Sequence, residues 1–97
     1  MKMHDWSLLS VAVGWKTGEI EIGLSAPGGP TSIRAEGLQD LRIPRAYPWG
    51  PSISINEVRG PTAQPDGLAR VEIEMQSGDL IEIIARSFRM PEQPETP

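Results

Sequence analysis

The strongest constraint on the fold is a pair of alternating segments late in the chain, residues 68–75 and 80–88. Apolar residues occupy every second position in each, which is the periodicity of a β-strand with one buried face. A three-residue loop keeps both apolar sets on one side, whereas loops of two or four residues would place Glu74 opposite Ile81. We therefore predict a hairpin with the cross-strand pairs Ile73 with Ile81, Val71 with Ile83, and Ala69 with Ala85.

The loop and charged positions of this hairpin lead to further predictions. Gly78 ends the three-residue loop and is expected at positive φ, which glycine adopts without steric cost. The register also sets Glu72 opposite Glu82. Two carboxylates in this arrangement destabilise a sheet unless a cation screens them, and Arg70 or Arg86 could do so.

The second strand of this hairpin is apolar on both faces. Leu80, Ile84 and Phe88 lie on the face opposite the residues that point toward the predicted core. We expect this strand to be central in its sheet, or to be covered on its second face by another copy of the chain. A homo-oligomeric structural module is therefore one hypothesis for function.

Another hairpin is predicted near the start of the chain, where apolar residues alternate over positions 9–15 and 19–24. A two-residue loop, Thr17-Gly18, places all large side chains on one face, whereas a three-residue loop would set Val13 opposite Glu21. The expected pairs are Trp15 with Ile20, Val13 with Ile22, Val11 with Leu24, and Lys16 with Glu19.

The remaining segments read as shorter elements. Glycine and proline place a turn at residues 25–30, without the following helix and lysine of a phosphate loop. A strand is expected over 31–36, with Ile33 and Ala35 inward, and another over 52–58. Residues 37–41 are ambiguous, because their two leucines are spaced as on a helical turn. Residues 59–67 are predicted to be the longest loop.

Composition supports an all-β fold. Ten glycines and ten prolines in 97 residues favour many turns and few long helices. We predict about six antiparallel strands in two hairpins, forming a sandwich, a curved sheet or a partly open barrel, with a short helical turn near 37–41 as an option. Residues 1–88 form one domain, and the proline- and glutamate-rich residues 89–97 form a disordered tail.

Several classes of chemistry have no support in the sequence. The chain has no cysteine and one histidine, which excludes thiolate sites and a histidine-rich metal site within one subunit. His4-Asp5 is the one histidine–carboxylate neighbour pair, and we interpret it as structural, with Asp5 capping a turn or pairing with an arginine while Trp6 and Leu8 dock on the sheet. We therefore expect no enzyme, and assign no catalytic, cofactor-binding or metal residue.

Charge and hydropathy limit the partners. The net charge of -4 lacks the basic footprint of a nucleic-acid-binding protein. No apolar run reaches membrane-spanning length and no signal peptide is recognisable, so we expect a cytoplasmic protein. The alternating glutamates read as the solvated side of a sheet. They are Glu19, Glu21, Glu72, Glu74 and Glu82.

The segment between the two hairpins is the best candidate for a contact surface. Three prolines and one glycine stiffen residues 42–51, so little conformational entropy is lost on binding. Tryptophan, tyrosine and arginine are enriched in interface hot spots. The alternative is that the aromatic side chains cover the core and the arginines pair with Asp40 or Glu57. The predicted protein-binding residues are Arg45, Tyr47, Trp49, Asn56 and Arg59.

Two parts of the chain carry a family resemblance. The opening His4-Asp5-Trp6-Ser7-Leu8, the hairpin and the strand leading into Gly37-Leu38 resemble a loose group of small bacterial proteins, some of which are regarded as immunity proteins of toxin systems. Residues 48–58, with Pro48-Trp49-Gly50-Pro51-Ser52, and residues 73–79 resemble a narrower uncharacterised family of about this length. The resemblance implies a protein-binding, immunity-like role and assigns no functional residue.

Overall fold

Six antiparallel strands form a single sheet in the order β1-β2-β3-β6-β5-β4, which is not closed into a barrel. The computed structural model describes residues 2–46 and 53–91. Within these ranges the one helical element is a 3-10 turn, η1 (Pro65–Gly67). The prediction of an all-β fold is confirmed. The strands are β1 (Ser7–Gly14), β2 (Glu19–Ala26), β3 (Gly29–Arg42), β4 (Ile55–Ala63), β5 (Ala69–Met75) and β6 (Leu80–Arg89).

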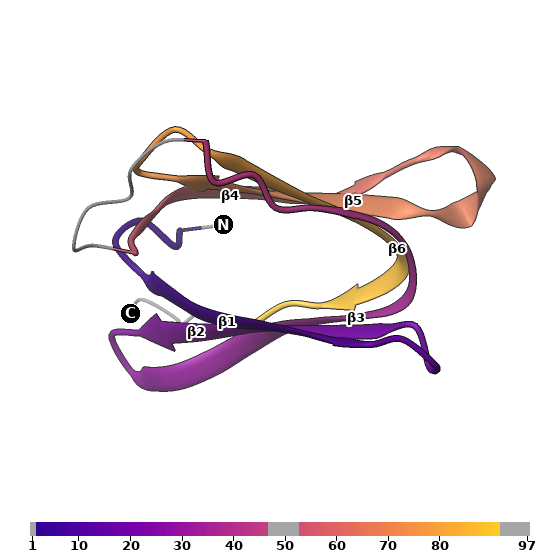
Figure 1. Ribbon diagram of the computed structural model, residues 1–97, viewed down its shortest axis with the longest axis horizontal. Coiled ribbons are helices and arrows are strands. Elements are labelled where there is room, and N and C mark those ends of the chain that lie inside the picture. Colours follow the sequence, from indigo (N-terminus) through magenta and orange to yellow (C-terminus); the bar gives the residue numbers. More distant parts are fainter. Residues whose placement is uncertain (1, 47–52, 92–97) are drawn as a thin grey trace, which may run out of the picture.

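The sheet is bent so that two halves face each other (Figure 1). β4 and β5 lie in one half and β1 and β2 in the other, while β6 curves from the first half to the second. The buried apolar side chains gather into one cluster, so the curved-sheet alternative is the observed one. Its members are Met3, Trp6, Leu8, Ile20, Ile22, Leu24, Ile33, Ala35, Ile55, Val58, Val71, Ile73, Met75, Ile81, Ile83 and Ala85.

The hairpin of β5 and β6 has the predicted register. The pairs are Ile73 with Ile81, Val71 with Ile83, and Ala69 with Ala85. Met75 and Asp79 close the three-residue loop through a backbone hydrogen bond of 2.9 Å. Gly78 has a φ of 99°, as expected for the position. Alternation together with the turn glycine was sufficient here because neither strand contains a bulge within this ladder.

β6 is a central strand, which is one of the two alternatives that its two apolar faces predict, and it lies between β3 and β5. The prediction was wrong for Phe88, which packs against the core cluster beside Ala35 instead of on the outer face. The strict alternation of β6 is interrupted at Arg86 and Ser87, which are both exposed. Phe88 follows this interruption and pairs with Ala35, a core residue, so it lies on the inner side of the sheet.

The first hairpin has a longer turn than predicted. Gly14 pairs with Glu19 and Val13 with Ile20, so the turn contains four residues, 15–18. Gly18, at φ 72°, donates its N–H to the Gly14 carbonyl oxygen at 2.8 Å. The predicted pairs were wrong by two positions, which keeps Val11 and Val13 on their expected face but moves Trp15 into the turn.

A bulge in β1 changes which of two leucines is buried. Leu8 pairs with Leu24 and Ser10 with Gly23, which leaves Leu9 as the extra residue. Leu8 belongs to the core, whereas Leu9 is 57% exposed. The prediction that Leu9 faces the core was therefore wrong, because an extra residue shifts the side-chain alternation by one position.

Residues 37–41 continue β3 and form no helical turn. Leu38 pairs with Ala85 and Leu41 with Ile83, with a bulge at Gln39 between them. The bulge puts two residues three apart on the same face of a strand. The spacing of Leu38 and Leu41 thus comes from an irregular strand instead of a helix.

β4 extends far into the predicted loop. It continues to Ala63, and its pairing with β5 is irregular near Asn56 and again between Arg59 and Thr62. The peptide bond between Gly60 and Pro61 is cis. The predicted long loop is thereby reduced to the short connection that contains η1.

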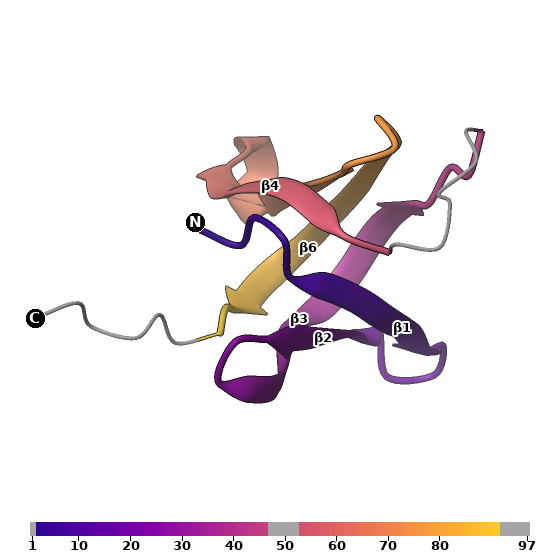
Figure 2. The ribbon, with the colours of Figure 1, turned by 90° about the vertical axis from the view of Figure 1, so that its left-hand side faces the viewer.

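The N-terminal segment covers the open end of the bent sheet (Figure 2). Met3 and Trp6 are 0% and 7% exposed, respectively. Backbone hydrogen bonds of 2.8 to 3.0 Å join Asp5, Trp6 and Leu8 to residues 53 and 55. The predicted docking of Trp6 and Leu8 on the sheet is confirmed.

At the other terminus, ordered structure continues beyond the expected domain end at residue 88. β6 ends at Arg89, Met90 packs against the core, and Pro91 is buried. The rest of the predicted tail, 92–97, lies outside the described residues.

Candidate functional site

The predicted contact residues do not form one described surface. Tyr47 and Trp49 lie outside the described residues. Arg45 is exposed, next to Ala46, whose N–H donates to Oδ1 of buried Asp79 at 3.0 Å. Asn56 and Arg59 lie on β4. The structure therefore brings Asn56 and Arg59 together, whereas Arg45 lies next to a residue that contacts Asp79.

Asn56 and Arg59 are joined through a shared carboxylate. Nδ2 of Asn56 donates to Oε2 of Glu74 at 2.6 Å, and Nη1 of Arg59 lies 3.5 Å from Oε1 of the same side chain. Arg59 also donates to Glu57 at 2.8 Å and lies 3.9 Å from Glu72. These polar groups already have intramolecular partners, which argues for a structural role of this face.

The carboxylates around Arg59 raise the pKa of its guanidinium. Burial lowers the pKa of the guanidinium, but the hydrogen bond to Glu57 and the charges of Glu57, Glu72 and Glu74 outweigh it and raise the pKa above its ordinary value. Because the pKa of Arg59 is higher in the folded chain than in the unfolded chain, its positive charge contributes fully to stability at any pH below the ordinary arginine pKa. This contribution is lost only as the pH rises through the raised pKa. Arg59 therefore remains charged throughout the neutral and mildly alkaline range.

Arg70 screens the opposed carboxylates of Glu72 and Glu82. The sequence offered Arg70 and Arg86 as alternatives for this role. Nη2 of Arg70 contacts Oε1 of Glu82 and lies 3.9 Å from Oε2 of Glu72. Replacing Arg70 with methionine keeps an apolar stem but removes the cation. We expect the free energy of unfolding to fall by about 1 kcal/mol at low salt, and by less at high salt, because screening weakens the carboxylate repulsion.

Chemical denaturation at two salt concentrations measures this effect. Arg34→Met is the matched control, since Arg34 pairs with one glutamate, Glu21, at a more exposed site. It should cost no more than about 0.5 kcal/mol. Adding Glu82→Gln to Arg70→Met should restore part of the lost stability. Equal costs for the two methionine variants would contradict the screening role of Arg70.

His4 and Asp5 anchor the N-terminal segment to β4 and to the β5–β6 turn. Nδ1 of His4 lies 2.9 Å from the Asn56 carbonyl oxygen, and Asp5 accepts a hydrogen bond of 2.6 Å from the Gln76 amide. Asp5 itself has a φ of 67°. The side-chain partner of Asp5 is thus an amide, whereas the sequence suggested that Asp5 caps a turn or pairs with an arginine. This arrangement accounts for the pair structurally, with both side chains held to neighbouring segments.

The two edges of the sheet differ in composition. β4 carries Glu57, Arg59, Pro61 and two pairing irregularities, which are features that protect an edge strand from further pairing. β1, with the sequence SLLSVAVG, contains no charged residue and no proline. Its first residues meet the chain before β4 at the Ser7–Ser54 bridge, and no backbone pair joins β1 to another described strand on that side beyond Leu8. β1 is therefore the less protected edge.

Exposed apolar side chains concentrate along this edge. Leu9 and Val13 are 57% and 41% exposed, and Trp15 in the adjoining turn is 93% exposed. Among the described residues, one other large apolar side chain is classed as exposed, Ile43, which lies after β3. Tryptophan is a common anchor of protein interfaces, so β1 and its turn combine apolar contact area with an accessible strand edge.

The backbone of β1 presents hydrogen-bonding groups along the same edge. The Gly14 carbonyl accepts within the hairpin, so the polar groups of Gly14 face β2. Backbone groups of successive residues in an antiparallel strand point to alternate sides, so those of Val11 and Val13 point away from β2. The outward N–H of Leu8, which donates to Ile53 at 3.0 Å before the bulge, supports this orientation.

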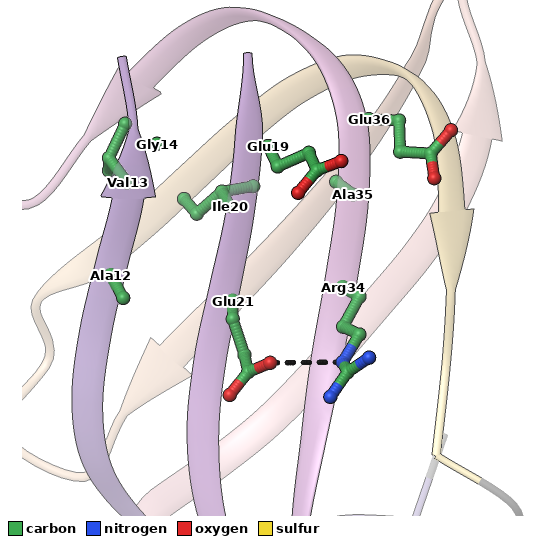
Figure 3. Close-up of a pocket in the computed structure, with 9 residues that line it drawn as sticks. All are labelled: Ala12, Val13, Gly14, Glu19, Ile20, Glu21, Arg34, Ala35 and Glu36. Atoms are coloured by element: carbon green, nitrogen blue, oxygen red, sulfur yellow. Dashed lines mark ion pairs between the residues drawn. The ribbon is translucent and has the colours of Figure 1, made fainter. Parts of the chain in front are cut away.

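A pocket of about 490 Å³ lies beside this edge (Figure 3). Ala12 and Gly14 of β1, Glu19 and Glu21 of β2, and Arg34 and Glu36 of β3 line it, together with the strand positions between them. Glu21 and Arg34 form an ion pair of 3.0 Å across the pocket. The pocket thus combines small residues on β1 with charged residues on β2 and β3.

Comparisons with known proteins identify no relative. Family models, curated proteins and solved structures all give no match to the chain. No helix in the described ranges has the length and hydropathy needed to cross a bilayer. The same ranges contain no group of three or more histidine, aspartate or glutamate side chains arranged to hold a metal ion. What the fold defines is an all-β protein with one strongly bent antiparallel sheet.

The features of the β1 edge were missed at the sequence level. Trp15 and Leu9 were assigned to the core because they fit a strict period of two. The absence of charge from residues 7–14 gave no signal of an edge, because it is unusual for an edge strand and ordinary for a central one. Sequence alone could not distinguish the two cases, because the position of a strand in its sheet is set by tertiary pairing.

Proposed function

We propose that this protein is a small non-enzymatic binding domain that adds an extended segment of a partner protein to its β1 edge. The observation that carries the proposal is the uncharged, proline-free edge with outward backbone groups at Val11 and Val13, beside exposed Leu9 and Trp15. In strand addition, main-chain hydrogen bonds supply affinity and alternate side chains supply specificity. The predicted contact surface around Arg45 is replaced in this proposal by β1 and its turn.

In its most specific form the proposal includes the role implied by the sequence resemblance. The partner is then a toxin that is neutralised in the cytoplasm, and the added strand belongs to it. A partner that contributes one extended strand needs little matching surface, which suits a domain of 97 residues.

A selection from a display library of random linear peptides tests strand addition. Enriched peptides are measured by titration against the wild-type chain, Val13→Pro and Val13→Ala. Proline removes the outward N–H and is tolerated on edge strands, whereas alanine removes only the exposed side chain. We expect Val13→Pro to weaken binding about tenfold or more, through one lost hydrogen bond and a steric conflict with the added strand, and Val13→Ala to weaken it less.

Amide hydrogen exchange supplies a second readout, with slower exchange expected at Val11 and Val13 in the complex. Thermal unfolding checks that both variants remain folded. Failure to enrich peptides, or enriched peptides that bind Val13→Pro as tightly as the wild type, would contradict the proposal. A wild-type chain that dimerises through β1, as shown by native mass measurement and loss of the dimer in Val13→Pro, would identify the occupant as a second copy and would also overturn it.

A further inference from the structure

The pocket beside β1 lies on the outer face of the sheet. Val13 pairs with Ile20 and Ile20 with Ala35, and the latter two belong to the core, so this row faces inward. Successive side chains of a strand point to opposite faces. Ala12 and Gly14 therefore face outward, beside Glu21 and Glu19, respectively.

The pocket has low side-chain bulk on the side nearest the exposed edge. Ala12 contributes one methyl group and Gly14 none, while the longer side chains stand on β2 and β3 (Figure 3). A strand added to β1 would place its own residues opposite Ala12 and Gly14 on this same outer face. From such a residue, Glu19 on β2 lies two strand spacings away, about 10 Å, and Glu36 on β3 lies three, about 14 Å, and no large side chain of β1 stands in the way.

The carboxylates at the pocket differ in whether they are paired. Glu21 is occupied by Arg34 at 3.0 Å. The carboxylates of Glu19 and Glu36 have no hydrogen bond or ion pair with any other described residue, and both residues are exposed. The pocket thus presents two unpaired negative charges to a group that extends over Ala12 and Gly14. Its one cation, Arg34, already pairs with Glu21.

We infer that the strand bound at β1 carries a lysine or arginine opposite Gly14 or Ala12, and that this side chain enters the pocket and pairs with Glu19, while Glu36 adds to the negative potential that attracts it. The inference rests on the proposed function, because it names the chemistry of the segment added to β1. The aliphatic stem of the basic residue lies over Ala12 and Gly14, and its cationic end extends toward the carboxylate of Glu19. Charge complementarity of this kind contributes more to specificity and to the rate of association than to total affinity.

The experiment uses the peptides selected on the wild-type chain. Enriched sequences should carry a lysine or arginine at one fixed position of the alternating pattern. In a synthetic peptide of the consensus sequence, replacing this residue with norleucine should weaken binding about threefold to tenfold on the wild-type chain, and more at low salt than at high salt. On the double variant Glu19→Gln, Glu36→Gln, the same replacement should change affinity less than about twofold, which is the signature of a direct pair in a double-mutant cycle.

Asp66→Asn is the matched control for net charge. Asp66 is exposed in η1 and does not line the pocket, so its neutralisation should leave the preference for the basic residue intact. The inference is overturned if enriched peptides lack a fixed basic residue, or if the norleucine effect is equal on wild type and double variant. Either result, combined with the expected loss of binding in Val13→Pro, would leave strand addition itself standing, whereas binding unaffected by Val13→Pro would contradict the proposed function.

Discussion

Replacing Trp6 with alanine is expected to lower the free energy of unfolding by about 3–5 kcal/mol, which is the usual cost of removing a large aromatic side chain from a core. Trp6 is 7% exposed and covers the open end of the bent sheet together with Met3. Its removal leaves a cavity, and the flanking hydrogen bonds to residue 55 hold the backbone in place and limit collapse. Urea denaturation followed by far-ultraviolet circular dichroism measures the change.

Trp15→Ala is the matched control for this prediction. The substitution is the same, but Trp15 is 93% exposed in the β1–β2 turn. Stability should change by no more than about 0.5 kcal/mol, while binding of selected peptides should weaken if Trp15 is an anchor of the β1 surface. Similar losses of stability in the two variants would contradict the claim that Trp6 is buried and covers the open end of the sheet.

Gly60→Ala is expected to destabilise the protein by about 3 kcal/mol or more. Gly60 has a φ of 105°, a conformation that residues with a Cβ adopt at a cost of roughly 1–2 kcal/mol. A Cβ at this position would also overlap the Arg70 carbonyl oxygen, so the pairing of β4 with β5 would have to shift. Backbone has less freedom to move aside than a flexible side chain, which adds about 1–3 kcal/mol.

Two other glycines separate these contributions. Gly67 has a φ of 75°, and a Cβ at this position would meet nothing within 4 Å, so Gly67→Ala measures the conformational cost alone, at about 1–2 kcal/mol. Gly28 has equally open surroundings without a positive φ, so Gly28→Ala should be neutral or slightly stabilising. Thermal and chemical unfolding should show the largest loss of stability for Gly60→Ala, a smaller loss for Gly67→Ala and no loss for Gly28→Ala. A Gly60 variant no less stable than the Gly67 variant would contradict the close approach of β4 to β5.

The difference between the two hairpins explains how much of the fold could be predicted. In β5 and β6 the ladder is regular, and one register satisfied both the apolar pattern and the glycine at the turn. In the first hairpin, turns of two and four residues both keep Val13 on the same face as its partner, whether that is Ile22 or Ile20. Apolar alternation cannot separate registers that differ by two positions, so the turn geometry decided between them.

The candidate site was harder to predict than the fold. Asn56 and Arg59 had the residue types of a contact surface, but the structure gives both an internal partner in Glu74. Tyr47 and Trp49 fall outside the described residues. The β1 edge was invisible at the sequence level, because uncharged alternating residues describe a buried central strand as well as an unprotected edge.

By itself, the sequence determined the all-β class and the β5–β6 hairpin, since both follow from local alternation and turn chemistry. Tertiary structure alone decided the bulges at Leu9 and Gln39, the exposure of Trp15 and which strands became edges. The physical reason is that a bulge or an edge is stabilised by pairing and packing between segments distant in the sequence. The alternation of apolar residues along one strand does not indicate which distant segments will pair with it.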